Sequence, residues 1–227
     1  MKFPYKIIDL SYLLTATIPT WDTDCGFISK TILDYKDPHE GTSFKVQHLS
    51  LPAGIGTHID APAHVCRDGK SVDQLRLADG IVPCVVINVS GCAQDYQVSV
   101  ADITSFEKRH GSIKAAICVF FYTGWSKYWS TPEAYRNNYQ FPSIHPDVAD
   151  YLISKKIVGI GIDTLGPDTL ASGFPVHQKL LSAGIYIIEN VAHLDQLPIT
   201  GAFSCALPLN YAGGTESPLR LVAFVAY

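Results

Sequence analysis

The sequence contains 227 residues with a formal net charge of −4 at pH 7, and 47% of the residues are hydrophobic against 17% charged. These proportions are typical of one globular domain over residues 1–227 and exclude a disordered chain. No lysine- and arginine-rich run suggests binding to nucleic acid, and no apolar run of about 18 residues suggests a membrane span. The six cysteines lack Cys-x-x-Cys spacing, which is typical of reduced thiols and favours a cytoplasmic protein.

Runs of β-branched and apolar residues predict the strands. Continuous apolar runs, such as residues 82–89, are typical of interior strands that are buried on both faces of a sheet. The predicted strands are Ile7–Leu14, Ser43–Leu51, Val82–Val89, Ala115–Tyr122, Val158–Ile162, Ile185–Ile188 and Leu219–Val225.

Three segments predict helices. Val100–Arg109 follows Ser99, a residue type that favours an N-cap, and ends before Gly111. His145–Lys156 has proline and aspartate in its first turn, and Val176–Ala183 predicts a shorter helix that ends at a glycine. Because strands outnumber helices, the sequence predicts an α/β fold, a single domain with a β-rich, barrel-like core and peripheral helices.

The segment from Gly56 to His64 carries the clearest chemical pattern. His58 and Asp60 are two residues apart, so their side chains point to one face of an extended segment. Pro62 interrupts a regular strand before His64, so we expect a strand end that turns. Two imidazoles and a carboxylate that converge on one small volume suit Zn²⁺, Mn²⁺ or Fe²⁺. A His-x-Asp pair on its own, by contrast, is usually a pair of ordinary polar loop residues.

The string Gly-Ile-Gly-Thr-His-Ile-Asp-Ala-Pro-Ala-His, from Gly54 to His64, resembles a family motif. The motif is the His-x-Gly-Thr-His-x-Asp-x-Pro-x-His of the cyclase family of metal-dependent hydrolases, which includes kynurenine formamidases and isatin hydrolases. Residues 159–164, 174–181 and 184–190 are similar to the second block of the family in order and spacing. The resemblance extends over most of the chain and implies the cyclase-type fold.

The resemblance implies roles for six side chains. His64 falls on the position of the family's proton-transferring histidine. Trp21 lies near the position of a substrate-contacting aromatic residue of the formamidases, although a buried structural tryptophan fits the sequence equally well. The implied metal ligands are His58, Asp60, His177 and Glu189.

One position departs from the motif. Its first histidine falls at position 54, where this chain has Gly54, and glycine has no side chain that can bind a metal. That histidine helps to bind one of the two metals that formamidases can hold, so we expect one divalent ion per subunit, Zn²⁺ or Mn²⁺. His48 could replace the lost ligand, but its offset from His58 gives no geometric support, and we interpret it as a strand-surface residue.

Asp163 and Asp168 flank Gly166 and Pro167 after a predicted buried strand. We interpret both aspartates as turn residues, because aspartate is common in turns. The alternative is that one of them shapes the site or orients a metal ligand from behind.

These residues together predict a hydrolase that cleaves a C–N amide bond, with metal-activated water as the nucleophile and His64 as the proton shuttle. The expected substrate is a small aromatic amide: an arylformamide such as N-formylkynurenine, from tryptophan catabolism, or a cyclic amide such as isatin. Two alternatives remain open, a polyketide-type cyclase or dehydratase and a degenerate metal-dependent binding protein. Because members of the family commonly form dimers or tetramers, we expect a homodimer or homotetramer.

Overall fold

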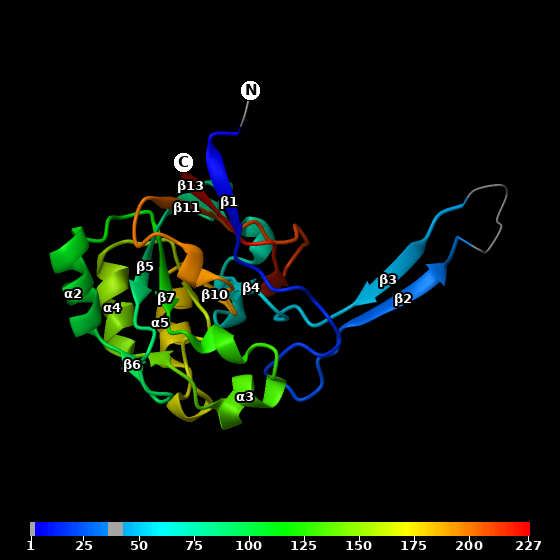
Figure 1. The fold of residues 1–227 in the computed structure, drawn as a ribbon, viewed down its shortest axis with the longest axis horizontal. Coiled ribbons are helices and arrows are strands. Elements are labelled where there is room, and N and C mark those ends of the chain that lie inside the picture. Colours follow the sequence, from blue (N-terminus) through cyan, green and yellow to red (C-terminus); the bar gives the residue numbers. More distant parts are fainter. Residues whose placement is uncertain (1–2, 36–42) are drawn as a thin grey trace.

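A computed structural model describes residues 3–35 and 43–227 (Figure 1). Its largest element is a nine-stranded sheet made of β1 (Tyr5–Asp9), β4 (His58–Asp60), β5 (Ile81–Asn88), β7 (Cys118–Tyr122), β9 (Gly159–Ile162), β10 (Tyr186–Glu189), β11 (Ala202–Cys205), β12 (Glu216–Pro218) and β13 (Val222–Ala226). The strands lie in the order β1-β13-β11-β5-β7-β9-β10-β4-β12. The sheet curls into a half-barrel, so the predicted α/β class with a β-rich, barrel-like core is confirmed.

The four central strands of this sheet, β5, β7, β9 and β10, run parallel to one another. Antiparallel strands flank them, with β11 next to β5 and β4 next to β10. Val119 and Phe121 of β7 face the helices, whereas Cys118 and Phe120 face the inside of the curl, and all four are fully buried. Burial on both faces explains why the central strands are continuous apolar runs.

Helices α2 (Val100–His110), α4 (Pro146–Ser154) and α5 (Pro175–Ser182) cover one face of the sheet (Figure 1), and the three predicted helices are confirmed. The start of α2 is set by Asp102, whose carboxylate accepts hydrogen bonds from the backbone N–H and the hydroxyl of Ser99, each at 2.8 Å. Gly111 follows the helix with φ 91°, a left-handed conformation that favours glycine. Within the described residues, no helix has the length and apolar character needed to cross a membrane.

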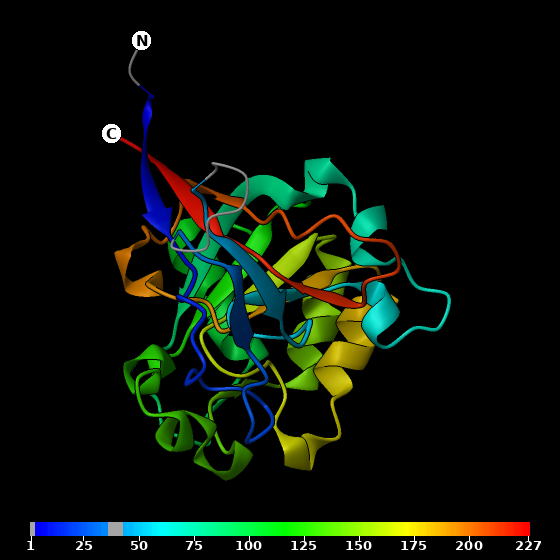
Figure 2. The same cartoon turned by 90° about the vertical axis from the view of Figure 1, so that its right-hand side faces the viewer.

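Shorter elements complete the fold. β2 (Ile28–Leu33) and β3 (Val46–Ser50) form a hairpin that projects from the body, and β1 and β13 lie side by side at one edge of the sheet (Figures 1 and 2). β6 (Gln97–Val98) pairs with β8 (Ser143–Ile144) in a small parallel sheet. The remaining helical turns are α1 (Leu77–Gly80), α3 (Pro132–Arg136), η1 (Pro62–His64), η2 (Val72–Gln74), η3 (Trp125–Tyr128), η4 (Asn137–Tyr139), η5 (Leu170–Ser172) and η6 (Leu194–Gln196).

Glu107 joins α2 to the end of α4. Its carboxylate accepts hydrogen bonds from the Lys155 ammonium and the Ile113 backbone N–H, both at 2.8 Å, and from the Tyr151 hydroxyl. Burial opposes the charged form of this carboxyl, but the hydrogen bonds from Lys155 and Tyr151 outweigh it and lower the pKa of Glu107 to about 2. The two helices are therefore held together by a charge-assisted contact.

Replacing Glu107 with Gln should lower the free energy of unfolding at pH 7 by about 1 kcal/mol, because the contact with Lys155 loses its charge. A pKa that folding lowers stabilises the protein above the unfolded-state value, and this stabilisation is lost as the pH falls through the folded-state value. The difference between the wild type and Glu107→Gln should therefore shrink between pH 4.5 and about pH 2. Denaturant titrations at several pH values measure it, with Glu133→Gln, on an exposed position of α3, as the control. A difference that is independent of pH would contradict this account.

Candidate metal centre

Three neighbouring strands bring four polar side chains to one face of the sheet. His58 and Asp60 of β4 share a face, as their spacing of two residues predicts. In the strand register, Glu189 of β10 lies opposite His58, and Glu216 of β12 lies opposite Asp60. Directly opposed residues have Cβ atoms about 4.5–5.5 Å apart, so each β4 side chain gains a carboxylate as its neighbour.

A fifth side chain, His177, comes from the first turn of α5. Asp168 precedes this helix in the chain. Its carboxylate accepts hydrogen bonds from the backbone N–H groups of Val176 and His177, at 3.2 and 2.9 Å. The same carboxylate contacts Nδ1 of the His177 ring at 2.8 Å. The interpretation of Asp168 as only a turn residue is therefore wrong, because it fixes both the start of the helix and the direction of the imidazole.

Asp163, in contrast, does not line the site. It is fully buried and accepts hydrogen bonds from the backbone N–H and the hydroxyl of Thr123, at 2.8 and 2.7 Å. Burial raises the pKa of its carboxyl. Asp163, directly after β9, thus fixes the start of the loop that follows β7, and among the described residues no hydrogen bond or ion pair joins its side chain to the cluster.

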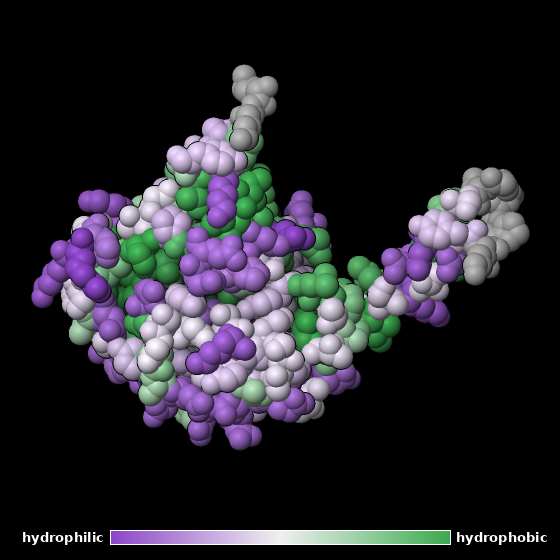
Figure 3. Space-filling view, viewed as in Figure 1, coloured by the Kyte–Doolittle hydropathy of each residue, from purple (hydrophilic) through white to green (hydrophobic). Residues whose placement is uncertain are grey.

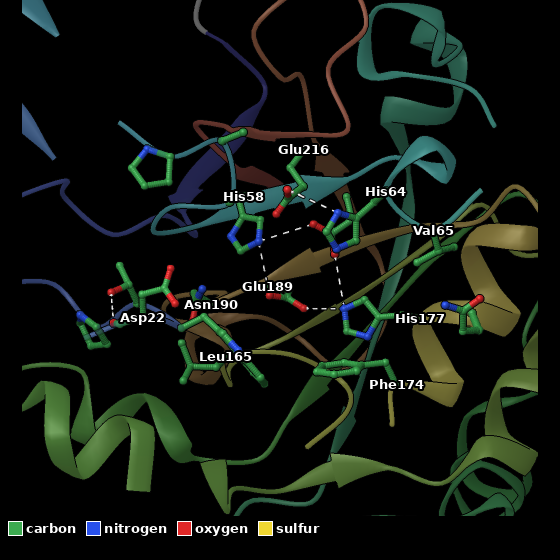
Figure 4. Close-up of a pocket in the computed structure, with 18 residues that line it drawn as sticks. Asp22, His58, His64, Val65, Leu165, Phe174, His177, Glu189, Asn190 and Glu216 are labelled. Carbon is green, nitrogen blue, oxygen red and sulfur yellow. Dashed lines mark hydrogen bonds and ion pairs between the residues drawn. The ribbon is translucent and has the colours of Figure 1, made fainter. Parts of the chain in front are cut away.

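The four predicted ligand side chains are buried, and each imidazole contacts both carboxylates. Figure 4 shows His58, Glu189 and His177 side by side. Nε2 of His177 lies 3.0 Å from Glu189 Oε1 and 3.7 Å from Asp60 Oδ2. Nε2 of His58 lies 3.3 Å from Glu189 Oε2 and 3.5 Å from Asp60 Oδ1. Each carboxylate therefore directs one oxygen at each imidazole.

Both imidazoles turn the same nitrogen toward the carboxylates of the cluster. Nδ1 of His58 lies 2.9 Å from the Gly56 carbonyl oxygen, and because a carbonyl can only accept, this nitrogen carries the hydrogen. Nδ1 of His177 is held by Asp168 in the same way. Each Nε2 is left for the centre, which is the usual arrangement of metal-binding histidines whose other ring nitrogen is hydrogen bonded.

The charged groups of this cluster shift one another's pKa values. Burial opposes the charged form of His58, but Glu189 and Asp60 outweigh it and raise its pKa to about 9. Burial is outweighed in the same way at His177, where Asp168 and Glu189 raise the pKa to about 10. Burial and the charge of Glu189 raise the pKa of Asp60, whereas hydrogen bonds from the two imidazoles overcome burial and lower the pKa of Glu189. The carboxylates therefore favour positive charge at the centre of the cluster.

The donor atoms present fit a divalent cation. Two groups of side chains place their ligand atoms within 4.8 Å of one another in the described part of the chain, one with Asp60, His177 and Glu189, the other with His58, Asp60 and Glu216. Oδ1 of Asp60 is buried and has no hydrogen-bond partner among the described residues. Imidazole nitrogen with carboxylate oxygen suits Zn²⁺ or Mn²⁺. The structure thus gathers the four predicted ligands, but it divides them between two groups that share Asp60.

The cluster faces a cavity of about 490 Å³ (Figure 4). Trp21, Leu165 and Phe174 contribute apolar walls to this cavity. The Trp21 ring packs against Phe174 at 5.6 Å and against Tyr139 at 4.8 Å between ring centroids. Trp21 therefore lies where a ligand in the cavity would meet it, and its predicted contact with substrate remains a prediction.

His64 lies beside the cluster and belongs to neither group of ligand atoms. It ends η1, which begins at Pro62 where β4 has stopped, so the predicted turn is confirmed. Its side chain is 35% exposed and lines the cavity, and its Nδ1 lies 3.3 Å from Glu216 Oε2. The contact with Glu216 outweighs burial and raises the pKa of His64. A partly exposed histidine in this place can exchange protons with a molecule in the cavity.

Glu216 is the residue of the cluster that the sequence analysis missed. No spacing connects it with the motif, and its place opposite Asp60 arises only when β12 pairs with β4. His48, the alternative considered for the missing ligand, is exposed on β3 and belongs to neither group, as its interpretation as a surface residue predicts.

A cavity that combines buried imidazoles and carboxylates with a more accessible histidine is typical of hydrolases that use a divalent metal. Comparison with known families agrees with this class. Residues 8–169 match the Cyclase family model, which is described as "Putative cyclase". Since this match covers more than half of the sequence, the chain belongs to the Cyclase family.

Curated relatives give the class of reaction. The isatin hydrolase of Roseibium aggregatum is 34% identical over 203 residues, which cover 82% of this chain and 77% of the relative. The kynurenine formamidase of Geobacillus thermodenitrificans is 32% identical over 215 residues, which cover 94% of each chain. Both relatives are amide-bond hydrolases, and this chain is an amide-bond hydrolase of the same family.

Solved structures share the fold over almost the whole chain. Isatin hydrolase A from Labrenzia aggregata, bound to benzyl benzoate, superposes with a TM-score of 0.90 at 32% identity and covers 99% of this chain and 95% of its own. A protein from Bacillus stearothermophilus, described as a predicted metal-dependent hydrolase, gives a TM-score of 0.77 at 27% identity and covers 97% of this chain and 98% of its own.

Replacing Asp168 with Asn should weaken divalent-metal binding by about 10- to 100-fold, because the amide has no negative charge to hold the His177 ring. Calorimetric titration with Zn²⁺ or Mn²⁺ measures the affinity. The matched control is Asp150→Asn. Asp150 is exposed on α4 and contacts Lys179 at 2.8 Å, and Lys179 lies on α5, the helix that carries His177. Equal affinities for the wild type and Asp168→Asn would contradict the orienting role of Asp168.

Proposed function

We propose that this chain is a divalent-metal-dependent hydrolase that cleaves the C–N amide bond of a small aromatic substrate. The observation that carries the proposal is the buried cluster of imidazoles and carboxylates, in which one Asp60 oxygen accepts no hydrogen bond from the described residues, open to a cavity with aromatic walls. The names of the curated relatives suggest the substrate class, either an arylformamide such as N-formylkynurenine or a cyclic amide such as isatin.

The proposed ligands of the catalytic ion, Zn²⁺ or Mn²⁺, are the four side chains that contact one another in the cluster. When bound, such an ion polarises a carbonyl oxygen and lowers the pKa of water to about 7. The Nε2 atoms that face the cluster and the buried carboxylate oxygens support this assignment, because both kinds of atom are common ligands of divalent ions. These ligands are His58, Asp60, His177 and Glu189.

His64 is the proposed general base and acid. The Glu216 carboxylate holds the hydrogen of the His64 ring on Nδ1, which leaves Nε2 free to take a proton. His64 would remove the proton from the attacking water and then deliver it to the leaving nitrogen. Its absence from both ligand groups supports this role, because a metal-bound nitrogen could not carry a proton.

Trp21 and Phe174 are the proposed contacts for the aromatic ring of the substrate. Both line the cavity, and the volume of about 490 Å³ lies within the range of about 300–1,000 Å³ that is typical of small-molecule sites. Flat apolar walls beside a polar cluster would orient an aryl amide with its carbonyl toward the carboxylates and imidazoles.

Incubation of the metal-loaded protein with N-formylkynurenine and with isatin, followed by absorbance, tests the proposed function. We expect hydrolysis of at least one of them, loss of turnover after chelation, and recovery when Zn²⁺ or Mn²⁺ is added back. Metal-loaded, folded protein that hydrolyses neither compound would contradict the proposal. Cyclisation of a polyketide chain with loss of water, without hydrolysis, would identify the cyclase alternative, and ligand binding without turnover would identify a binding protein.

Replacing His64 with Ala should reduce kcat by about 10²- to 10⁴-fold, the usual contribution of general acid–base catalysis, and leave the metal content unchanged. Steady-state kinetics and metal analysis of the same preparation measure both quantities. His110→Ala changes an exposed histidine at the end of α2 and serves as the control. Loss of metal together with activity would show that His64 is a ligand.

We also propose that the chain acts in the cytoplasm as a homodimer or homotetramer. The projecting β2–β3 hairpin exposes Ile28, Ile32 and Leu49, and Figure 3 shows apolar residues at its base. An isolated two-stranded hairpin is marginally stable, and exposed apolar groups of this kind favour a protein contact. All six cysteines are free, as is usual in a reducing compartment. Sedimentation equilibrium that finds only monomers would contradict the oligomer.

A further inference from the structure

We propose that Glu216 replaces the histidine that the family motif has at position 54, and that it binds a second divalent ion together with His58 and Asp60. This inference rests on the proposed function, because it adds a ligand group to the same centre. It also changes the expectation of a single ion, and it assigns Nε2 of His58 to the second ion, so that Asp60, His177 and Glu189 remain as the ligands of the first.

Glycine at position 54 is explained by space and not by backbone conformation. Gly54 is absent from the residues with positive φ, so its backbone would accept any side chain, unlike Gly56 with φ +61°. A Cβ atom at position 54 would lie 2.1 Å from Glu216 Oε1 and 3.4 Å from Nε2 of His58. Non-bonded atoms do not approach to 2.1 Å, so the Glu216 oxygen occupies the space in which any side chain at position 54 would begin.

The pairing of β12 with β4 puts this carboxylate within reach of a second ion. Glu216 lies opposite Asp60 in the register, and ligand atoms of Glu216, Asp60 and His58 lie within 4.8 Å of one another. A carboxylate from the neighbouring strand thus lies beside His58. The family motif instead has an imidazole at position 54, in the turn that precedes β4. The exchange replaces a nitrogen ligand with an oxygen ligand and retains three protein donors.

Asp60 is placed to bridge two ions. Its Oδ2 lies 3.7 Å from Nε2 of His177, in the first group, and its Oδ1 lies 3.5 Å from Nε2 of His58, in the second group. Oδ1 is buried, and no described residue hydrogen bonds to it. A buried carboxylate oxygen that accepts no hydrogen bond and is only approached by an imidazole at 3.5 Å is costly, and an ion between His58 and Glu216 would supply the missing contact.

Glu216 also contacts His64 through its second oxygen, Oε2, at 3.3 Å. Loss of Glu216 would therefore disturb both the second ion and the proposed proton shuttle. For this reason turnover cannot separate the two effects, and the test must count ions.

The test compares Mn²⁺ bound per chain after equilibrium dialysis, counted by plasma mass spectrometry, with electron paramagnetic resonance to detect coupling between paired ions. We expect two coupled ions in the wild type and in the control Glu133→Ala, and one uncoupled ion in Glu216→Ala. Gly54→Ala should bind the second ion more weakly than the wild type, because its Cβ must move the Glu216 oxygen. The double variant Gly54→His, Glu216→Gly should recover the second ion through the exchanged imidazole.

The number of bound ions distinguishes a failure of the proposed role of Glu216 from a failure of the proposed function. Two ions in Glu216→Ala, or one ion in both the wild type and Glu216→Ala, would overturn the role of Glu216 and leave the proposed function standing. A wild type without bound Mn²⁺ or Zn²⁺ would overturn the proposed function as well. If circular dichroism shows that Glu216→Ala is unfolded, Gly54→Ala decides, and an affinity for the second ion equal to that of the wild type would overturn the proposal. Failure of the double variant to recover an ion would refute the exchange of histidine for glutamate.

Discussion

A carboxylate that is almost fully buried needs positive charge or hydrogen-bond donors around it, and Asp60 has too few donors for its two oxygens. The neighbouring strands and helix α5 supply the side chains that surround it. His58 follows from the alternation of β4, and Glu189 follows from the register with β10. His177 comes from α5, which packs against β10 on the face of the sheet that the helices cover. The packing of β4, β10 and α5 thus brings buried carboxylates together, and a cation at their centre would stabilise them.

The scaffold holds this arrangement through buried hydrogen bonds as well as through packing. The Tyr135 hydroxyl shares its one hydrogen between the Asp163 carbonyl oxygen at 2.9 Å and the Asn190 side-chain oxygen at 3.0 Å. The amide of Asn190 donates in turn to the Gly56 carbonyl, which also fixes the His58 ring. Each imidazole is therefore oriented by groups behind it, so that its free nitrogen is already directed before any ligand binds. Such preorganisation reduces the cost of assembling a catalytic centre.

Physical reasons separate what could be predicted from sequence from what could not. Long apolar runs and capped helices, such as residues 82–89 and α2, carry local signals, and their predictions are confirmed. The short strands β11 and β12 carry little local pattern and form only through long-range pairing, so they were missed. Glu216 was missed for the same reason. Asp168 was misinterpreted because an aspartate that caps a helix and holds a histidine looks, in sequence, like a turn residue.

The central claim is that the buried carboxylates and imidazoles exist to hold a divalent cation. Anomalous diffraction from a crystal of the Mn²⁺-loaded protein, collected at the manganese absorption edge, tests it most directly. The account predicts a strong peak bounded by Asp60, His177 and Glu189, in the cavity that His64 lines. Peaks confined to surface carboxylates, with the cluster still closed by its own hydrogen bonds, would contradict it.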